Sequence, residues 1–440
     1  MNGLSVVFVC VAIVSIIILP RRWVFLPFLA GACYMTYGQG IKIGPFNFFV
    51  IRLLILAGIV RVILKRERLA GRLNKLDRMV IAWAAVAVLS CLGHEEPPAA
   101  LVFRLGLVFD NAGIYFLARI FIRSLEDVVF LCRFIAILLV PVALEMISEK
   151  MTGQNRFAAF GGVAPDCTIR EGKIRGQGPF MHPILAGTVG ALSLPLMAAL
   201  LRHERKVAQV GLAATAAIVY CSGSSGPMMS AIFAVGALLF WRYRQYMSKL
   251  RWLAVFSYIG LDLMMKVPAY YLLGRMDLAG GSTGFHRAQL INSAINHLSE
   301  WWLIGTDYTR HWMPTGVSWS PNHTDITNQY ISMGILGGLP LMFTFIGMLV
   351  LGFVGVGRAL RASRRMAMKW KFMIWAMGAS LFANAATCIS VSYFDQSFLF
   401  LYVVLGAVGT LWGLPDFSPK AAVAASGFPT SGEWAAKSAV

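Results

Sequence analysis

Long apolar segments recur from one end of this 440-residue chain to the other, and they constrain its fold more than any other feature. A helix needs about 20 mostly apolar residues to cross about 30 Å of hydrocarbon. Hydrophobic residues make up 58% of the chain and charged residues only 13%, which excludes an ordinary water-soluble domain. We predict an all-α, polytopic membrane protein of about 12 to 14 transmembrane helices, with residues 1–414 forming one helical domain. Such segments begin at Leu4, Phe46, Met79, Asp127 and Leu339.

Basic residues account for the formal net charge of +19, and they gather in clusters between alternate apolar segments. The positive-inside rule assigns basic loops to the cytoplasm, so threading the segments in order puts the clusters on one side. Membrane topology therefore explains the charge better than nucleic-acid binding, and we expect no nucleic acid among the partners. The clusters lie at residues 65–78, 202–206, 242–251 and 358–371.

The same threading puts the N-terminus and three further stretches outside the cytoplasm, at residues 94–98, 148–182 and 273–328. We interpret the first apolar segment as an uncleaved anchor, because it is followed by Arg21 and Arg22 and lacks a small-residue cleavage site. Residues 415–440 are rich in Ala, Ser, Gly and Pro, which predicts a disordered cytoplasmic tail.

The first long outer loop, at 148–182, ends with a polar motif. Arg175 is followed by Gly176 and Gly178, and then by His182 and Pro183 at the start of the next apolar segment. A guanidinium group at the membrane surface suits a phosphate, because its planar fork binds two oxygens at once. Alternatively, Arg175 is an interfacial arginine that reaches lipid headgroups, and His182 is a hydrogen-bonded residue at a helix start.

The second long loop, at 273–328, contains a helical pattern. Leu290, Ala294, Ile295 and Leu298 are spaced for one face of a helix, which predicts an amphipathic helix at the membrane face with Arg287 near its beginning. The tryptophans of this loop fit an interfacial belt, and the alternative is a set of sugar-stacking platforms. They are Trp301, Trp302, Trp312 and Trp319.

His323 lies just before the apolar segment that follows this loop. Helical rise would place Gly334 and Gly337 one turn apart on one face, where they permit close helix packing. An imidazole with an unperturbed pKa near 6.5 can take a proton from a hydroxyl group close to neutral pH. Three further residues of the loop are candidates to line an acceptor groove, although a solvated loop surface explains them equally well. They are Asp307, Arg310 and Asp325.

Several charged residues lie in or beside apolar segments. Arg104 and Asp110 do not share a helix face, so we predict that each pairs with another helix. Arg104 is nearer the outer end and is a candidate for a further phosphate contact. Glu145 and Glu149 precede the first long loop, where they are candidates to orient Arg175. A solvated helix end is the interpretation we favour for both.

No metal or cofactor is predicted. Of the seven cysteines only Cys167 falls clearly in an outer loop, and the chain contains no CxxC or HExxH spacing.

These motifs resemble those of the bacterial O-antigen ligase and polysaccharide polymerase superfamily, which includes WaaL-type ligases and Wzy-type polymerases. The likeness covers roughly residues 150–340. The segment from Arg175 to Pro183 is similar to the family's arginine, glycine, phenylalanine and proline stretch. His323, Gly334 and Gly337 keep the ligase spacing, with Thr324 in place of an amide or serine. Arg287 matches the second family arginine, although Ile291 stands where that pattern has leucine.

The resemblance implies a GT-C-like membrane glycosyltransferase of the bacterial inner membrane, with its active site facing the periplasm. Such an enzyme uses a glycan on undecaprenyl pyrophosphate as donor and a sugar hydroxyl as acceptor, without a metal or nucleotide. Arg175, Arg287 and Arg104 would then bind the donor pyrophosphate, and His323 would activate the hydroxyl for inverting displacement. The residues expected on the acceptor side are Asp325, Thr324 and Asp307.

Two choices stay open at this level. A lipid-linked oligosaccharide flippase, or another polytopic transporter, is the alternative from a different functional class. It predicts paired broken helices in corresponding halves and charges at mid-membrane, whereas the polar residues of this chain are concentrated in the outer loops. Within the enzyme class, the acceptor is either the lipid A core, as for an O-antigen ligase, or another lipid-linked glycan, as for an O-antigen or exopolysaccharide polymerase.

Overall fold

The computed structural model describes residues 1–275, 284–318 and 320–413, and 73% of it is helical. The helices are α1 (Gly3–Ile18), α2 (Phe25–Tyr34), α3 (Val50–Lys65), α4 (Lys75–Leu89), α5 (Pro97–Phe121), α6 (Leu125–Thr152), α7 (Pro183–Leu200), α8 (Arg205–Cys221), α9 (Ser225–Leu239), α10 (Met247–Met264), α11 (Gly284–Asn296), α12 (Leu298–Trp301), α13 (Gln329–Ala362), α14 (Met368–Thr387) and α15 (Phe398–Gly413).

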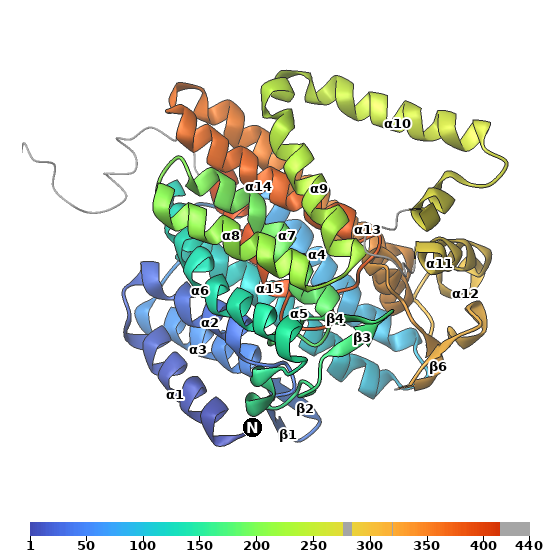
Figure 1. Ribbon diagram of the computed structural model, residues 1–440, viewed down its shortest axis with the longest axis horizontal. Helices are drawn as coiled ribbons and strands as arrows, with labels where there is room; N and C mark the ends of the chain where they lie inside the picture. Colours follow the sequence, from blue (N-terminus) through green and yellow to red (C-terminus); the bar gives the residue numbers. More distant parts are fainter. Residues whose placement is uncertain (276–283, 319, 414–440) are drawn as a thin grey trace, which may run out of the picture.

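Short 3-10 helices and antiparallel hairpins complete the described chain (Figure 1). The hairpins pair β1 (Gly40–Ile43) with β2 (Phe46–Phe49), β3 (Thr168–Arg170) with β4 (Lys173–Arg175), and β5 (Gly316–Val317) with β6 (Ser320–Thr324). The 3-10 helices that bear on the site are η2 (Ser90–Gly93) and η6 (Arg310–Trp312).

The protein is an all-α membrane protein, as predicted. Six helical stretches in the described part of the chain are long and apolar enough to cross a bilayer. This number is below the 12 to 14 spans expected from the sequence, partly because apolar runs such as α1 and α15 form helices of only 16 residues. The six are Lys75–Gly93, Pro97–Phe121, Leu125–Thr152, Pro183–Leu200, Ser225–Met264 and Gln329–Arg365. The tail predicted at 415–440 lies outside the described residues.

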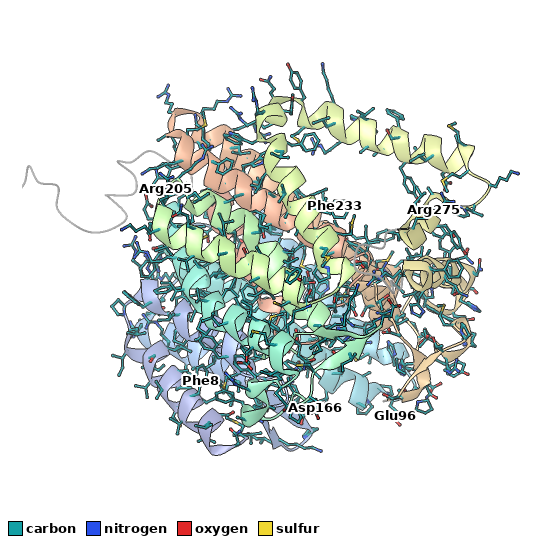
Figure 2. All side chains as sticks on the ribbon, viewed as in Figure 1. Phe8, Glu96, Asp166, Arg205, Phe233 and Arg275 are labelled. Carbon is teal, nitrogen blue, oxygen red and sulfur yellow. The ribbon has the colours of Figure 1, made fainter. Side chains whose placement is uncertain are left out.

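Two of the loops that the sequence places outside, at 94–98 and 148–182, lie near each other (Figure 2). Figure 2 shows Asp166 and Glu96 near each other, far from Arg205 at the start of α8. At the centre, α7 packs against α8, α9 and α14, and 83% of its residues are buried, as expected for a helix that is apolar on all sides. By contrast, α10 has no buried residue, so its apolar side chains are available to lipid.

Ion pairs between helices account for several charges in apolar segments. Arg52 of α3 contacts Asp110 of α5, with Nη2 at 2.8 Å from the carboxylate, so the predicted interhelical pairing of Asp110 is confirmed. Arg119 of α5 and Asp77 of α4 are both fully buried and 2.8 Å apart. Removing one partner from such a pair leaves a buried charge and typically costs about 3–5 kcal/mol.

Helix α13 is broken at two glycines. Gly337 (φ −162°, ψ 29°) and Gly338 (φ 69°, ψ −173°) leave the helical region, so the prediction that Gly334 and Gly337 share one continuous helix face is wrong. A Cβ at Gly338 would lie 2.3 Å from the carbonyl of Leu303, which explains why only glycine fits this close approach. Gly334 instead packs against Trp301 of the outer loop.

Candidate functional site

Arg175 is the last residue of β4, and a buried carboxylate holds the turn that follows it. Glu149, at the end of α6, accepts the backbone N–H groups of Gln177 at 2.5 Å and Gly178 at 2.9 Å. A Cβ at Gly176 would lie 2.9 Å from this carboxylate, so a side chain there would displace it. Glu149 is fully buried, which contradicts the expected solvated helix end. The buried carboxyl group is tolerated because it accepts two backbone N–H groups.

The Arg175 guanidinium is fixed by the loop between α8 and α9. Its Nη2 donates to the Ser224 hydroxyl, and its Nε donates to the Ser222 carbonyl at 3.4 Å. Its stem lies over Gly223, whose φ of 54° suits glycine. Burial and the nearby Arg170 lower the pKa of Arg175.

Arg287 lies in the first turn of α11, so a helix here with Arg287 near its start is confirmed. Of the predicted apolar face, Leu290 and Ala294 are buried, whereas Ile295 is exposed and Leu298 lies in α12. Its Nε is buried, and no described residue accepts a hydrogen bond from it. Burial and Arg170 lower the pKa of Arg287, while Asp325 acts in the opposite direction. A buried guanidinium nitrogen without an acceptor is costly, which suggests that an external anion completes its surroundings.

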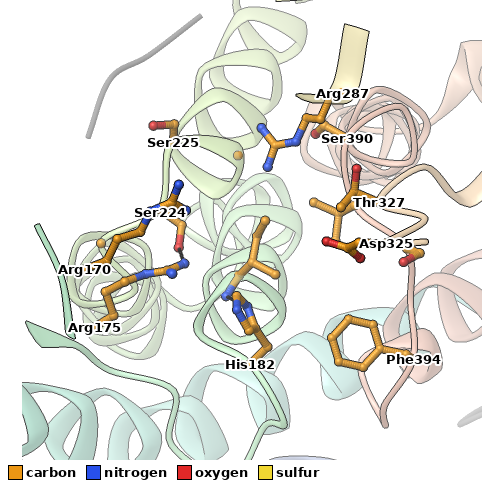
Figure 3. A pocket seen from close by; sticks show the side chains of 15 residues that line it. Arg170, Arg175, His182, Ser224, Ser225, Arg287, Asp325, Thr327, Ser390 and Phe394 are labelled. Atoms are coloured by element: carbon orange, nitrogen blue, oxygen red, sulfur yellow. Dashed lines mark hydrogen bonds between the residues drawn. The ribbon is translucent and has the colours of Figure 1, made fainter. Parts of the chain in front are cut away.

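Both arginines line one cavity of about 210 Å³ (Figure 3). Its walls include the first residues of α7, α9 and α11, and helix N-termini favour anions through their partial positive charge and directed N–H groups. Three guanidinium groups face one carboxylate, Asp325, among the described lining residues. The described residues that line the cavity are Arg170, Arg175, His182, Ile184, Gly223, Ser224, Ser225, Gly226, Arg287, Asp325, Thr327, Ser390, Val391, Ser392 and Phe394.

His182 lies between Arg175 and Asp325 in this cavity (Figure 3). Its Nδ1 accepts the backbone N–H of Ile184 at 3.1 Å, so it caps α7, which confirms a hydrogen-bonded histidine at the helix start. Burial, Arg175 and Arg170 lower the pKa of His182 to about 4, so the ring is neutral at pH 7. With Nδ1 accepting, the ring proton is on Nε2, which makes His182 a hydrogen-bond donor.

His323 does not line the cavity in the described structure. It lies in β6, where its Nδ1 is 2.7 Å from the Ser320 hydroxyl, and burial lowers its pKa while Asp307 acts to raise it. Thr324 is buried and donates to the Thr315 carbonyl at 2.8 Å, so it holds the hairpin together. Of the residues predicted on the acceptor side, Asp325 alone is among the described lining residues.

Arg104 lies in a second cluster, outside the described lining of the cavity. Its Nη2 donates to the Leu336 carbonyl and lies 3.2 Å from His94 Nε2. The residue four positions after Leu336 is Pro340, which has no N–H to offer this carbonyl. The Nδ1 of His94 is 2.6 Å from Asp307, which also accepts the Glu95 N–H at 2.8 Å. Although burial acts to raise it, these hydrogen bonds lower the pKa of Asp307. The cluster joins the 94–98 turn to the broken helix.

The tryptophans of the second loop differ in environment. Trp301 and Trp312 are buried, and Trp301 Nε1 donates to the Ala294 carbonyl at 2.9 Å, so these two rings form the core of the loop. Trp302 is exposed, and Trp319 lies outside the described residues.

Sequence reasoning missed several cavity residues. Arg170 and the serines at 224, 225, 390 and 392 were not selected, nor was Thr327, whose buried hydroxyl has no hydrogen-bond partner among the described residues. One signal was available for two of them, because the polar run Ser-Gly-Ser-Ser-Gly at 222–226 separates two apolar segments.

No protein-family model and no curated protein matches the chain.

Proposed function

We propose that the protein is a membrane glycosyltransferase that moves a glycan from undecaprenyl pyrophosphate to a sugar hydroxyl at the periplasmic face of the bacterial inner membrane. The observation that carries the proposal is the cavity shared by Arg175 and Arg287, which are more than 100 positions apart in the chain. We call it the arginine cavity.

The charge of the arginine cavity suits a diphosphate. Arg170, Arg175 and Arg287 outnumber the single carboxylate of Asp325 by two positive charges among the described lining residues. A diphosphate diester carries two negative charges, so its charge would balance the excess positive charge of the cavity. The cavity volume of about 210 Å³ is below the ~300–1,000 Å³ of sites that enclose a whole organic ligand. It therefore suits the charged head of the donor, with glycan and lipid lying outside.

Arg175 and Arg287 would both bind the leaving diphosphate, but they differ in their surroundings before it binds. Arg175 is held by Ser222 and Ser224 before any ligand arrives, whereas the Nε of Arg287 lacks an acceptor among the described residues. In the reaction, the bond between the anomeric carbon and the phosphate oxygen breaks, and negative charge grows on the diphosphate. Preorganised cations and the Nε2–H of His182 would stabilise that charge.

The acceptor hydroxyl would approach along β6, which leads from His323 directly to Asp325 at the cavity wall. Its oxygen attacks the anomeric carbon, its proton passes to His323 or Asp325, and undecaprenyl pyrophosphate leaves. In-line attack inverts the anomeric configuration. We assign the orienting role to His323 and the contact beside the diphosphate to Asp325; Thr324 supports the strand between them.

Release of undecaprenyl pyrophosphate from a lipid-linked glycan by the purified protein in lipid nanodiscs tests the proposal. If each arginine supplies one charge-assisted hydrogen bond of about 1.5–3 kcal/mol to the leaving group, R175A and R287A should each lose roughly one to two powers of ten in turnover. R156A is the matched control, because Arg156 is an exposed arginine of the same outer face and should retain full turnover.

Other outcomes would contradict the proposal. A lipid-linked oligosaccharide flippase would move the donor between leaflets without releasing undecaprenyl pyrophosphate.

If release occurs, the surface polysaccharide of a deletion strain distinguishes a ligase from a polymerase. Loss of long chains from the lipid A core indicates a ligase, and accumulation of single repeat units indicates a polymerase.

A further inference from the structure

The second outer loop brings two imidazoles and a carboxylate together away from the arginine cavity. His297 directly precedes α12, Glu300 lies within it, and His311 lies in η6. The Nδ1 of His297 is 2.7 Å from the Glu300 carboxylate, and the Nε2 of His311 is 3.0 Å from it. One possible ligand atom from each of the three lies within 4.8 Å of the others, and none of the three is among the described residues of the arginine cavity.

We propose that His297, Glu300 and His311 form a binding site for a divalent transition-metal cation, with Zn²⁺ as the representative ion. Two imidazoles and one carboxylate suit Zn²⁺ and its first-row neighbours, whereas Mg²⁺ and Ca²⁺ require oxygen ligands. The inference is independent of the proposed glycosyl transfer. We assign the ion a structural role, because it would link the end of α11 and the short helix α12 to η6.

The rings are oriented by more than their contact with Glu300. The His297 ring stacks on Trp312, with centroids 5.7 Å apart and planes 9° from parallel, and the His311 ring stacks on Tyr308 at 5.0 Å and 13°. Trp312 Nε1 donates to one carboxylate oxygen of Glu300 at 3.0 Å. Metal sites depend on such outer contacts, because they fix the ligands in the orientation that the ion requires.

The site is open to solvent, so an ion can enter. The side chains of His297, Glu300 and His311 are 32%, 35% and 35% exposed. A plain hydrogen-bonded cluster would share this geometry, and the two interpretations differ in whether the ion binds.

Calorimetric titration of the purified full-length protein with ZnCl₂ tests the proposal, using an affinity tag without histidine. We expect the wild type to bind one Zn²⁺ per chain at this site, and E300Q or H297A/H311A to weaken that binding by at least about 10–100-fold. W312F should weaken it less than the loss of a ligand does, because it removes only the outer hydrogen bond. H203A is the matched control and should bind as the wild type does, since His203 lies in the turn after α7.

Thermal unfolding provides a second measurement, because it also shows whether each variant is folded before Zn²⁺ is added. Zn²⁺ should raise the melting temperature of the wild type and of H203A, and a chelator should reverse the shift. The shift should vanish in E300Q, which keeps the volume of the side chain. Mg²⁺ should neither shift the transition nor compete. Equal Zn²⁺ binding by wild type and H297A/H311A, or absence of binding by the wild type, would overturn the proposal.

Discussion

The carboxylate of Glu149 accepts the backbone N–H of Gln177 at 2.5 Å, and this bond joins the end of α6 to the turn that follows Arg175. Because the same carboxyl group also accepts the Gly178 N–H, it fixes the turn after Arg175, while the Arg175 guanidinium itself donates to Ser222 and Ser224. Glu149 is thus a positioning residue for the arginine cavity.

We expect E149A to reduce turnover strongly. The substitution leaves two buried N–H groups without acceptors, at about 1–3 kcal/mol each, and releases the turn after Arg175. E149Q should lose less, because one amide oxygen can still accept. Donor turnover and melting temperature should be measured together. E145A is the control, because Glu145 is only half-buried and accepts one N–H, from Arg156, so it should stay close to wild type.

The variant R287M should separate stability from activity. In the ligand-free protein the Arg287 Nε is buried, and no described residue accepts a hydrogen bond from it. An apolar side chain of similar length should therefore leave the melting temperature unchanged or raise it. Turnover should fall by roughly one to two powers of ten. A large drop in melting temperature would show that Arg287 is structural and would contradict its assignment to the donor.

His182 should make the protein less stable in acid. Its folded pKa of about 4 lies below the unfolded value of 6.5, so the unfolded state binds more protons between these two values. The stability from a neutral His182 is therefore fully present above pH 6.5 and is lost as the pH falls towards 4. In H182N, which retains a side chain that caps helices, the melting temperature should depend less on pH over this window. Identical pH profiles for the two proteins would contradict the lowered pKa.

Gly338 should not tolerate a side chain. G338A combines a φ of +69° with a Cβ 2.3 Å from the Leu303 carbonyl, so we expect destabilisation of at least about 1–3 kcal/mol. G236A is the matched control, because Gly236 lies in α9 and its added Cβ would meet no described atom within 4 Å beyond the neighbouring backbone of its own helix. It should be neutral or should stabilise the helix by up to about 1 kcal/mol. Thermal unfolding of both variants in the same detergent compares them directly.

Local pattern in the sequence was sufficient for the fold class and for the beginnings of two helices, although not for the number of membrane spans. Apolar runs predicted an all-α membrane protein, the spacing of Leu290 and Ala294 predicted α11, and the position of His182 before Pro183 predicted the start of α7. Each of these depends on residues within a few turns of one another, where periodicity and capping act.

Contacts between distant segments were decided only by the tertiary structure. The sequence put Arg104 with Arg175 and Arg287. In the structure α5 packs against η2, which also contacts the broken helix α13, and Arg104 meets His94 and the Leu336 carbonyl there. The sequence also left Glu149 in solvent, because nothing near it in the chain shows that a backbone turn 28 positions later would bury it. A side chain's partners depend on where whole helices pack, and local periodicity carries no information about that packing.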